Sequence, residues 1–255
     1  RQGERTITSD ADMPDYLIRP DGTRLAYVHR TGRAPTILFL PGYMSDMAGG
    51  KATALDRWAV DNGQAMLRLD YAGCGQSDGA FEDGTLPSWR DDVLAVIDAV
   101  TRGPLLIVGS SMGGWLMLLV ALARPERVAG LVGIAAAPDF TDWGYSPEQR
   151  DMLAGGGRVE EPSDYGPPQV TSAGFWRSGQ ASLLLGRIVP IDCPVRLLHG
   201  QADIDVPFAI SLRLAAALRS TDVHTILIKG GDHRLSRPED IQALTTVVAR
   251  LLEVP

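Results

Sequence analysis

The sequence predicts an α/β protein built on a mostly parallel β-sheet with helices on both faces. Short β-branched and leucine-rich runs alternate with longer segments of helical spacing, which is typical of parallel strands joined by crossover helices. Several of the runs are apolar throughout, as strands must be when both faces of their sheet are covered. The chain has 255 residues. A single domain over 1–255 is therefore expected, since one α/β unit often reaches about 250 residues.

The chain is expected to open with an antiparallel hairpin. Its strands are residues 16–18 and 25–29, and the Pro-Asp-Gly sequence between them is typical of a turn. Parallel strands are expected at residues 36–40, 65–69, 105–108, 128–134, 195–198 and 223–228. Apolar residues at helical spacing predict helices at residues 51–62, 89–101, 112–123, 207–219 and 238–253.

The stretch 138–188 interrupts this alternation. It holds three consecutive glycines, several prolines and six aromatic residues, and it shows no clear periodicity. Long irregular segments inside a compact domain usually serve function, so we expect a cap or lid inserted over one end of the sheet. A merely structural insertion is the alternative. Its aromatics, such as Trp143 and Tyr145, either line an acyl or aromatic pocket or hold the segment together.

Composition excludes several classes of protein. With 24 basic and 31 acidic residues, the formal charge is −7, and 45% of residues are hydrophobic. This is globular composition without a basic stripe, so nucleic acid is not an expected partner. No apolar run approaches the ~18 residues of a membrane span. The sequence leaves the oligomeric state open.

Cysteine usage favours a reducing compartment. Cys74 and Cys193 lie far apart and form no metal-binding or redox pair. A cytoplasmic location is therefore expected. Because the sequence begins with Arg rather than Met, a mitochondrial location is the alternative if a transit segment has been removed.

The most informative stretch is a candidate nucleophile elbow. An apolar run at 105–108 leads into Gly109-x-Ser111-x-Gly113, and an apolar helical segment follows at once. In such a strand-to-helix turn the nucleophile takes strained backbone angles, and the flanking glycines remove side chains that would clash. Ser111 is therefore the predicted nucleophile, placed where free N–H groups of a helix start face developing negative charge.

Two other serines compete with Ser111. Ser77 lies in a second G-x-S-x-G match at 75–79, but this match sits in a polar, turn-rich stretch without an entering strand or a leaving helix. Ser110 lies one residue out of register with both glycines of the elbow. Both are expected to have structural roles.

A serine nucleophile needs a base, and the chain has four histidines. His29 and His224 are expected at the surface or the sheet edge. His199 ends a strand where the chain must turn immediately at a glycine. His233 follows the last strand, in a loop at the carboxyl edge where open α/β sheets build their sites. His233 is therefore the predicted base.

The acid that orients the base is expected after another strand, between the serine and the histidine. Asp203 comes directly after a strand-end turn and is preferred. Asp205 precedes Val-Pro at a helix entry and can be explained as a helix cap. Asp232 adjoins His233 and is poorly placed to bond its ring.

The tetrahedral intermediate needs N–H donors for its oxyanion. The residue after the nucleophile supplies one of them, the backbone N–H of Met112. The other is expected from the loop after the 36–40 strand, through the backbone of Tyr43, where Gly42 permits close approach. A simple turn at Pro41-Gly42 is the alternative.

On its elbow at 109–118, its loop at 40–45 and its turn at 70–79, the chain resembles the α/β-hydrolase superfamily. It is most similar to the branch of mitochondrial palmitoyl-protein thioesterase, which also cleaves mycophenolic acid acyl-glucuronide, and its bacterial relatives. The resemblance implies Ser111, Asp203 and His233 as nucleophile, acid and base, a small-molecule acyl ester or thioester as substrate, and no metal or organic cofactor. Many members have His-Gly where this chain has Pro41-Gly42, which leaves open how the oxyanion loop is braced.

These observations predict a serine hydrolase that cleaves carboxylic esters or thioesters through an acyl-enzyme. Dehalogenases and epoxide hydrolases of similar fold use Asp, and the serine at 111 argues against both. Carbon–carbon bond hydrolases and perhydrolases keep the serine and remain alternatives. A non-catalytic binding module is the alternative from another class. The sequence does not decide acyl-chain preference, or between ester, thioester and acyl-glucuronide.

Overall fold

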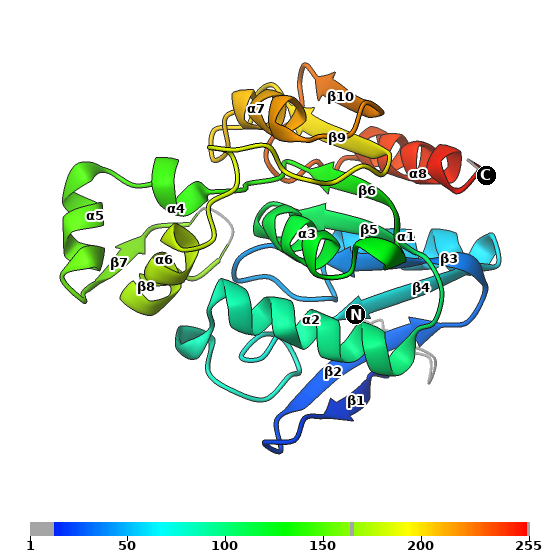
Figure 1. The fold of residues 1–255 in the computed structure, drawn as a ribbon, viewed down its shortest axis with the longest axis horizontal. Helices are drawn as coiled ribbons and strands as arrows, with labels where there is room; N and C mark the ends of the chain where they lie inside the picture. The colour runs from blue at the N-terminus through cyan, green and yellow to red at the C-terminus, as the bar shows by residue number, and fades with distance from the viewer. Residues whose placement is uncertain (1–12, 164–165, 254–255) are drawn as a thin grey trace, which may run out of the picture.

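The computed structural model describes residues 13–163 and 166–253. They form a central eight-stranded sheet in the order β1-β2-β4-β3-β5-β6-β9-β10 (Figure 1). β1 and β2 pair antiparallel, as do β2 and β4, and the remaining pairs are parallel. The strands are Asp15–Ile18 (β1), Arg24–Arg30 (β2), Arg33–Leu40 (β3), Gln64–Leu69 (β4), Leu105–Ser110 (β5), Val128–Ile134 (β6), Val195–Gly200 (β9) and Val223–Ile228 (β10). The predicted hairpin and the predicted parallel strands are all present.

Helices cover both faces of the sheet (Figure 1). They are Gly50–Asp61 (α1), Leu86–Val100 (α2), Met112–Ala123 (α3), Ala209–Ala217 (α7) and Pro238–Leu252 (α8). Buried side chains of α2, α3 and α7 share one core cluster, and those of α1 and α8 share another. In β3, Leu38 and Leu40 belong to the first cluster and Ile37 and Phe39 to the second. Successive side chains of a strand point to opposite faces, so a strand covered on both sides is apolar throughout.

Helix boundaries follow capping signals. α2 begins at Leu86, earlier than predicted, because the Thr85 hydroxyl accepts from the Ser88 backbone N–H in a capping box. α8 begins at Pro238, as predicted, with Asp240 in its first turn. Within the described part of the chain no helix is long and apolar enough to cross a membrane.

The described residues of the stretch 138–188 contain short helices and strands, so the expectation of irregular structure throughout it was wrong. It contains Phe140–Trp143 (α4), Pro147–Ala154 (α5), the paired strands Arg158–Glu161 (β7) and Gln169–Ser172 (β8), and Ala173–Gln180 (α6). Each element spans at most eight residues, too short for helical periodicity to emerge. The elements stand apart from the main sheet (Figure 1). We refer to residues 138–188 as the insertion.

Candidate active site

Ser111 occupies the turn between β5 and α3 with a strained backbone. Its φ is 55° and its ψ is −120°, angles that a residue with a side chain rarely adopts. The surrounding chain holds this conformation from both sides. The Ser111 N–H donates to Ile134 O at 2.9 Å, and its carbonyl accepts from Gly114 N–H at 2.9 Å and Ala137 N–H at 3.0 Å.

The flanking glycines are required by contacts with backbone. A Cβ on Gly109 would lie 2.3 Å from Gly113 O. A Cβ on Gly113 would lie 2.1 Å from Leu40 O. Both distances are far below van der Waals contact, so a side chain at either position would force the elbow apart.

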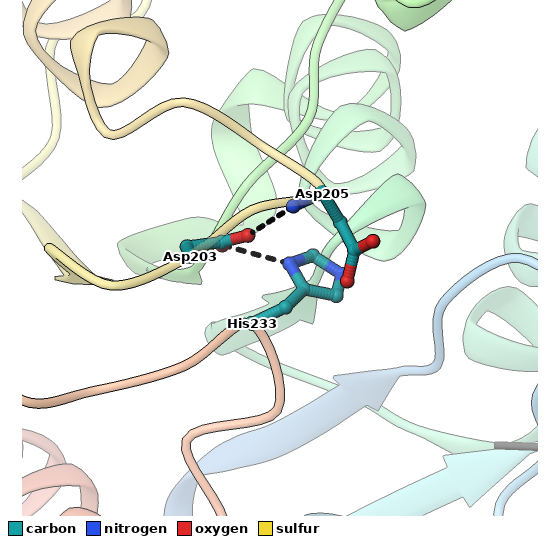
Figure 2. Close-up of side chains that lie close together, drawn as sticks. All are labelled: Asp203, Asp205 and His233. Atoms are coloured by element: carbon teal, nitrogen blue, oxygen red, sulfur yellow. Dashed lines mark hydrogen bonds and ion pairs between the residues drawn. The ribbon is translucent and has the colours of Figure 1, made fainter. Parts of the chain in front are cut away.

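His233 bridges Ser111 and Asp203. Its Nδ1 lies 2.8 Å from Asp203 Oδ2, and its Nε2 lies 3.1 Å from Ser111 Oγ. A carboxylate only accepts, so Nδ1 donates to Asp203 and Nε2 is free to accept from the serine hydroxyl. Asp203 follows β9 and His233 follows β10, so the sheet's carboxyl edge brings the three predicted residues together. Figure 2 shows the imidazole turned toward Asp203.

The Asp203 side chain is fully buried and surrounded by donors. Its Oδ1 accepts from the backbone N–H groups of Asp205 at 2.9 Å and Val206 at 2.8 Å. Burial by itself raises the pKa of Asp203, but hydrogen bonds from His199 and His233 outweigh it and hold that pKa well below its usual range. Asp203 is therefore a carboxylate at neutral pH, as a partner for an imidazolium must be.

His199 is a second histidine on Asp203. It is fully buried, with Nε2 2.9 Å from Val206 O and 3.2 Å from Asp203 Oδ2. Because a carbonyl oxygen only accepts, Nε2 carries the proton, and Nδ1 accepts from Ser211 Oγ at 2.7 Å. Sequence reasoning considered His199 only as a base. Its position four residues before Asp203, at the same strand end, was the signal for this supporting role.

Asp205 is exposed, and its carboxylate lies beside the His233 ring (Figure 2). The interpretation of Asp205 as a helix cap was wrong, because α7 begins at Ala209 and its N-cap residue, Phe208, makes no side-chain cap bond. Ligand atoms of Asp203, Asp205 and His233 lie within 4.8 Å of one another, a spacing that fits a metal ion. However, Asp203 and His233 already bond each other there, so an ion would have to break that contact.

The loop that carries His233 is fixed by two further contacts. Asp232 accepts from Leu235 N–H at 3.0 Å and does not bond its neighbour's ring. Lys51 of α1 donates from Nζ to Arg234 O. Burial lowers the pKa of Lys51 to about 8, and the charge of Arg234 acts in the same direction.

The loop after β3 lies directly against Ser111. A Cβ on Gly42 would lie 3.3 Å from Ser111 Cβ. Met112 is the first residue of α3, so its backbone N–H has no acceptor within the helix. The Tyr71 hydroxyl, fully buried, donates to Pro41 O at 2.9 Å and braces the loop where many superfamily members have His-Gly. Sequence reasoning did not find Tyr71.

A cavity of about 630 Å³ opens over these residues. Ser111 and His233 line it, together with Tyr43 of the loop after β3 and Trp143 and Tyr145 of the insertion. Its volume suits a small-molecule ligand.

The competing residues have structural roles. Ser77 donates from Oγ to Asp70 O at 2.7 Å and accepts from Ala26 N–H at 2.9 Å, which ties the 70–79 turn to β2. His224 is exposed on β10, and His29 lies half-buried in β2. The exposed edge position of His224 was predicted, whereas His29 is more buried than expected.

This fold, with its strand-to-helix elbow and the three residues gathered above it, is that of the alpha/beta hydrolases. The chain belongs to the alpha/beta hydrolase fold family, whose profile matches residues 35–158.

Within that family it is similar to human palmitoyl-protein thioesterase ABHD10, mitochondrial, with 42% identity over 243 residues, or 93% of this chain and 79% of the relative. The structure of alpha/beta hydrolase domain-containing protein 10 from mouse superposes with a TM-score of 0.88 at 40% identity, covering 94% of this chain and 98% of that one. A putative hydrolase from Agrobacterium vitis S4 superposes with a TM-score of 0.88 at 36% identity, with the same coverage. The name of the human relative places that protein in mitochondria, so it lends no support to the expected cytoplasmic location.

Proposed function

We propose that this protein is a serine hydrolase that cleaves acyl esters or thioesters through an acyl-enzyme on Ser111. The observation that carries the proposal is the position of His233, 3.1 Å from Ser111 Oγ on one side and 2.8 Å from Asp203 Oδ2 on the other. Serine is a weak nucleophile, and this arrangement supplies the base that activates it and the carboxylate that orients the base.

In the proposed reaction, Ser111 Oγ attacks the acyl carbonyl while its proton passes to His233 Nε2. Asp203 stabilises the imidazolium through Nδ1–H. The backbone N–H groups of Met112 and Tyr43 receive the oxyanion. His233 then protonates the departing alcohol or thiol. A water molecule, deprotonated by the same imidazole, attacks the acyl-enzyme and releases the carboxylic acid.

The substrate class is proposed from the relatives and the cavity. The relatives' names describe a thioesterase that acts on palmitoylated protein, so a thioester of a long acyl chain is the substrate we propose. We also propose that the insertion is a cap over the site, because Trp143 and Tyr145 line the cavity that holds Ser111. A mitochondrial location is proposed on the relatives' names alone.

The proposal is tested by labelling with a fluorophosphonate probe, which reacts only with an activated serine. Labelling of wild-type protein that is lost in Ser111→Ala and kept in Ser77→Ala supports the proposal. Ser77→Ala is the matched control because Ser77 occupies the chain's second G-x-S-x-G sequence. Folded wild-type protein that takes up no probe points instead to a binding module.

Turnover then identifies the reaction. Acyl thioesters, esters and acyl-glucuronides of short and long chains are compared side by side, with carbon–carbon cleavage and perhydrolysis as the competing chemistries. His233→Ala should abolish hydrolysis without unfolding the protein. Turnover at the wild-type rate in that variant contradicts the assignment of the base.

A further inference from the structure

Tyr43 lies between the reaction centre and the insertion. Its backbone follows Gly42, at which a Cβ would lie 3.3 Å from Ser111 Cβ. Its side chain reaches out of the site to the insertion, where the hydroxyl donates to Val170 O in β8 at 2.7 Å, across 127 residues of sequence. One residue therefore joins the reaction centre to the insertion.

The ring of Tyr43 lies between the body of the protein and the insertion. From the insertion, Phe175 of α6 approaches to 4.8 Å between ring centroids and Phe140 of α4 to 5.9 Å. From the body, Phe81 lies at 5.0 Å and Trp89 of α2 at 6.1 Å. Three of these four contacts have edge geometry, which is favourable for aromatic pairs and sensitive to displacement. The ring is therefore packed against the insertion and the body at once, and a shift of one against the other would change its contacts.

The backbone of Tyr43 is held in a tight turn. Ser45 N–H donates to Gly42 O at 3.2 Å, and Met44 has a φ of 55°, in the left-handed region. At the other end, Tyr71 holds Pro41 O. Within this turn, a change in the backbone angles of Tyr43 would move its side chain and its N–H together.

We propose that Tyr43 is a positioning residue that couples the docking of the insertion to the oxyanion site. With the insertion docked, the bond to Val170 O aims the Tyr43 N–H at the position of the oxyanion. When the insertion moves away, the bond to Val170 O is lost, the Tyr43 N–H is no longer held toward the oxyanion, and the oxyanion loses this donor. This inference rests on the proposed function, because it needs the Tyr43 N–H to act on a tetrahedral intermediate.

The decisive variant is Tyr43→Phe, which keeps the ring and the backbone N–H and removes the hydroxyl that bonds Val170 O. An oxyanion donor acts in the transition state and not on the bound substrate, so kcat should fall while KM stays within about two-fold. Complete loss of one such donor lowers kcat by about 100-fold or more, so a misaimed donor should lower it by about 10-fold. A trifluoromethyl ketone, whose adduct carries an oxyanion, should bind weaker by the same factor.

Ser178→Ala is the matched control. Ser178 of α6 accepts from the Leu86 N–H at 3.1 Å, so its removal also breaks one hydrogen bond between the insertion and the body, away from Ser111. Hydrogen exchange at residues 169–172 measures how far each variant loosens the insertion. Ser178→Ala should change kcat by less than two-fold.

The outcomes separate the two proposals. A labelled, active enzyme in which Tyr43→Phe keeps the wild-type kcat and ketone affinity overturns the coupling and leaves the proposed function intact. Equal losses of kcat in both variants also overturn it, because docking in general would then matter and Tyr43 would not. Hydrolysis that persists in Ser111→Ala overturns the proposed function itself.

Discussion

Gly113→Ala tests how closely the elbow and the loop after β3 are packed. The new Cβ would lie 2.1 Å from Leu40 O and 2.6 Å from Pro41 O, both backbone atoms that lead into Gly42. Ordinary carbon–oxygen contacts lie near 3.3 Å, so the first distance must grow by about 1.2 Å. Neither atom can rotate away, because both belong to the main chain.

The expected loss follows from that displacement. A shift of about 1 Å at the reacting geometry lowers the rate by about 100-fold. Overpacking of this kind lowers the free energy of unfolding by about 1–3 kcal/mol. We therefore expect kcat/KM for p-nitrophenyl ester hydrolysis to fall by about 100-fold, with a measurable loss of stability in urea.

Gly186→Ala is the control for the same substitution in open space. Within the described residues no heavy atom outside its chain neighbours lies within 4 Å of the position its Cβ would take. It should retain wild-type turnover and stability. If Gly113→Ala matched Gly186→Ala in both measurements, the loop would be free to move and the close packing would not hold the proposed oxyanion site.

Three further predictions concern buried groups. His199→Phe keeps a ring but leaves Asp203 without one donor, so the free energy of unfolding in urea should fall by about 1–3 kcal/mol, and an unchanged value contradicts the bonding of His199. The pKa of Lys51 is about 8 in the folded protein and about 10.4 unfolded. Between these values the unfolded chain binds more protons, so stability should rise with pH from about 8 to 10, and an equal rise in Lys51→Met would contradict this assignment. Burial raises the pKa of Cys74 to about 12 and of Cys193 to about 11, so both should react slowly with iodoacetamide at pH 8 until urea unfolds the chain, and rapid labelling of native protein would contradict their burial.

The fold was predictable because its signals are local. Several parallel strands are buried on both faces and appear as apolar runs, as residues 37–40 illustrate. The insertion was not predictable in detail, because its helices have eight residues or fewer. α5 nevertheless carried a local signal, the Ser146–Gln149 capping box with Pro147 at its start.

The sequence by itself determined the succession of strands and helices along the chain and the elbow around Ser111. Strand hydrophobicity, helix capping and the glycines on either side of the nucleophile are all local features of the sequence. It also singled out Asp203 and His233 as candidates, through their places after successive strands. Only the tertiary structure decided that Ser111 and His233, 122 residues apart, lie in hydrogen-bond contact. It alone decided that His199 supports Asp203 and that the Tyr43 hydroxyl reaches the insertion. Such contacts join segments brought together by sheet pairing and core packing, and no spacing along the chain encodes their distances.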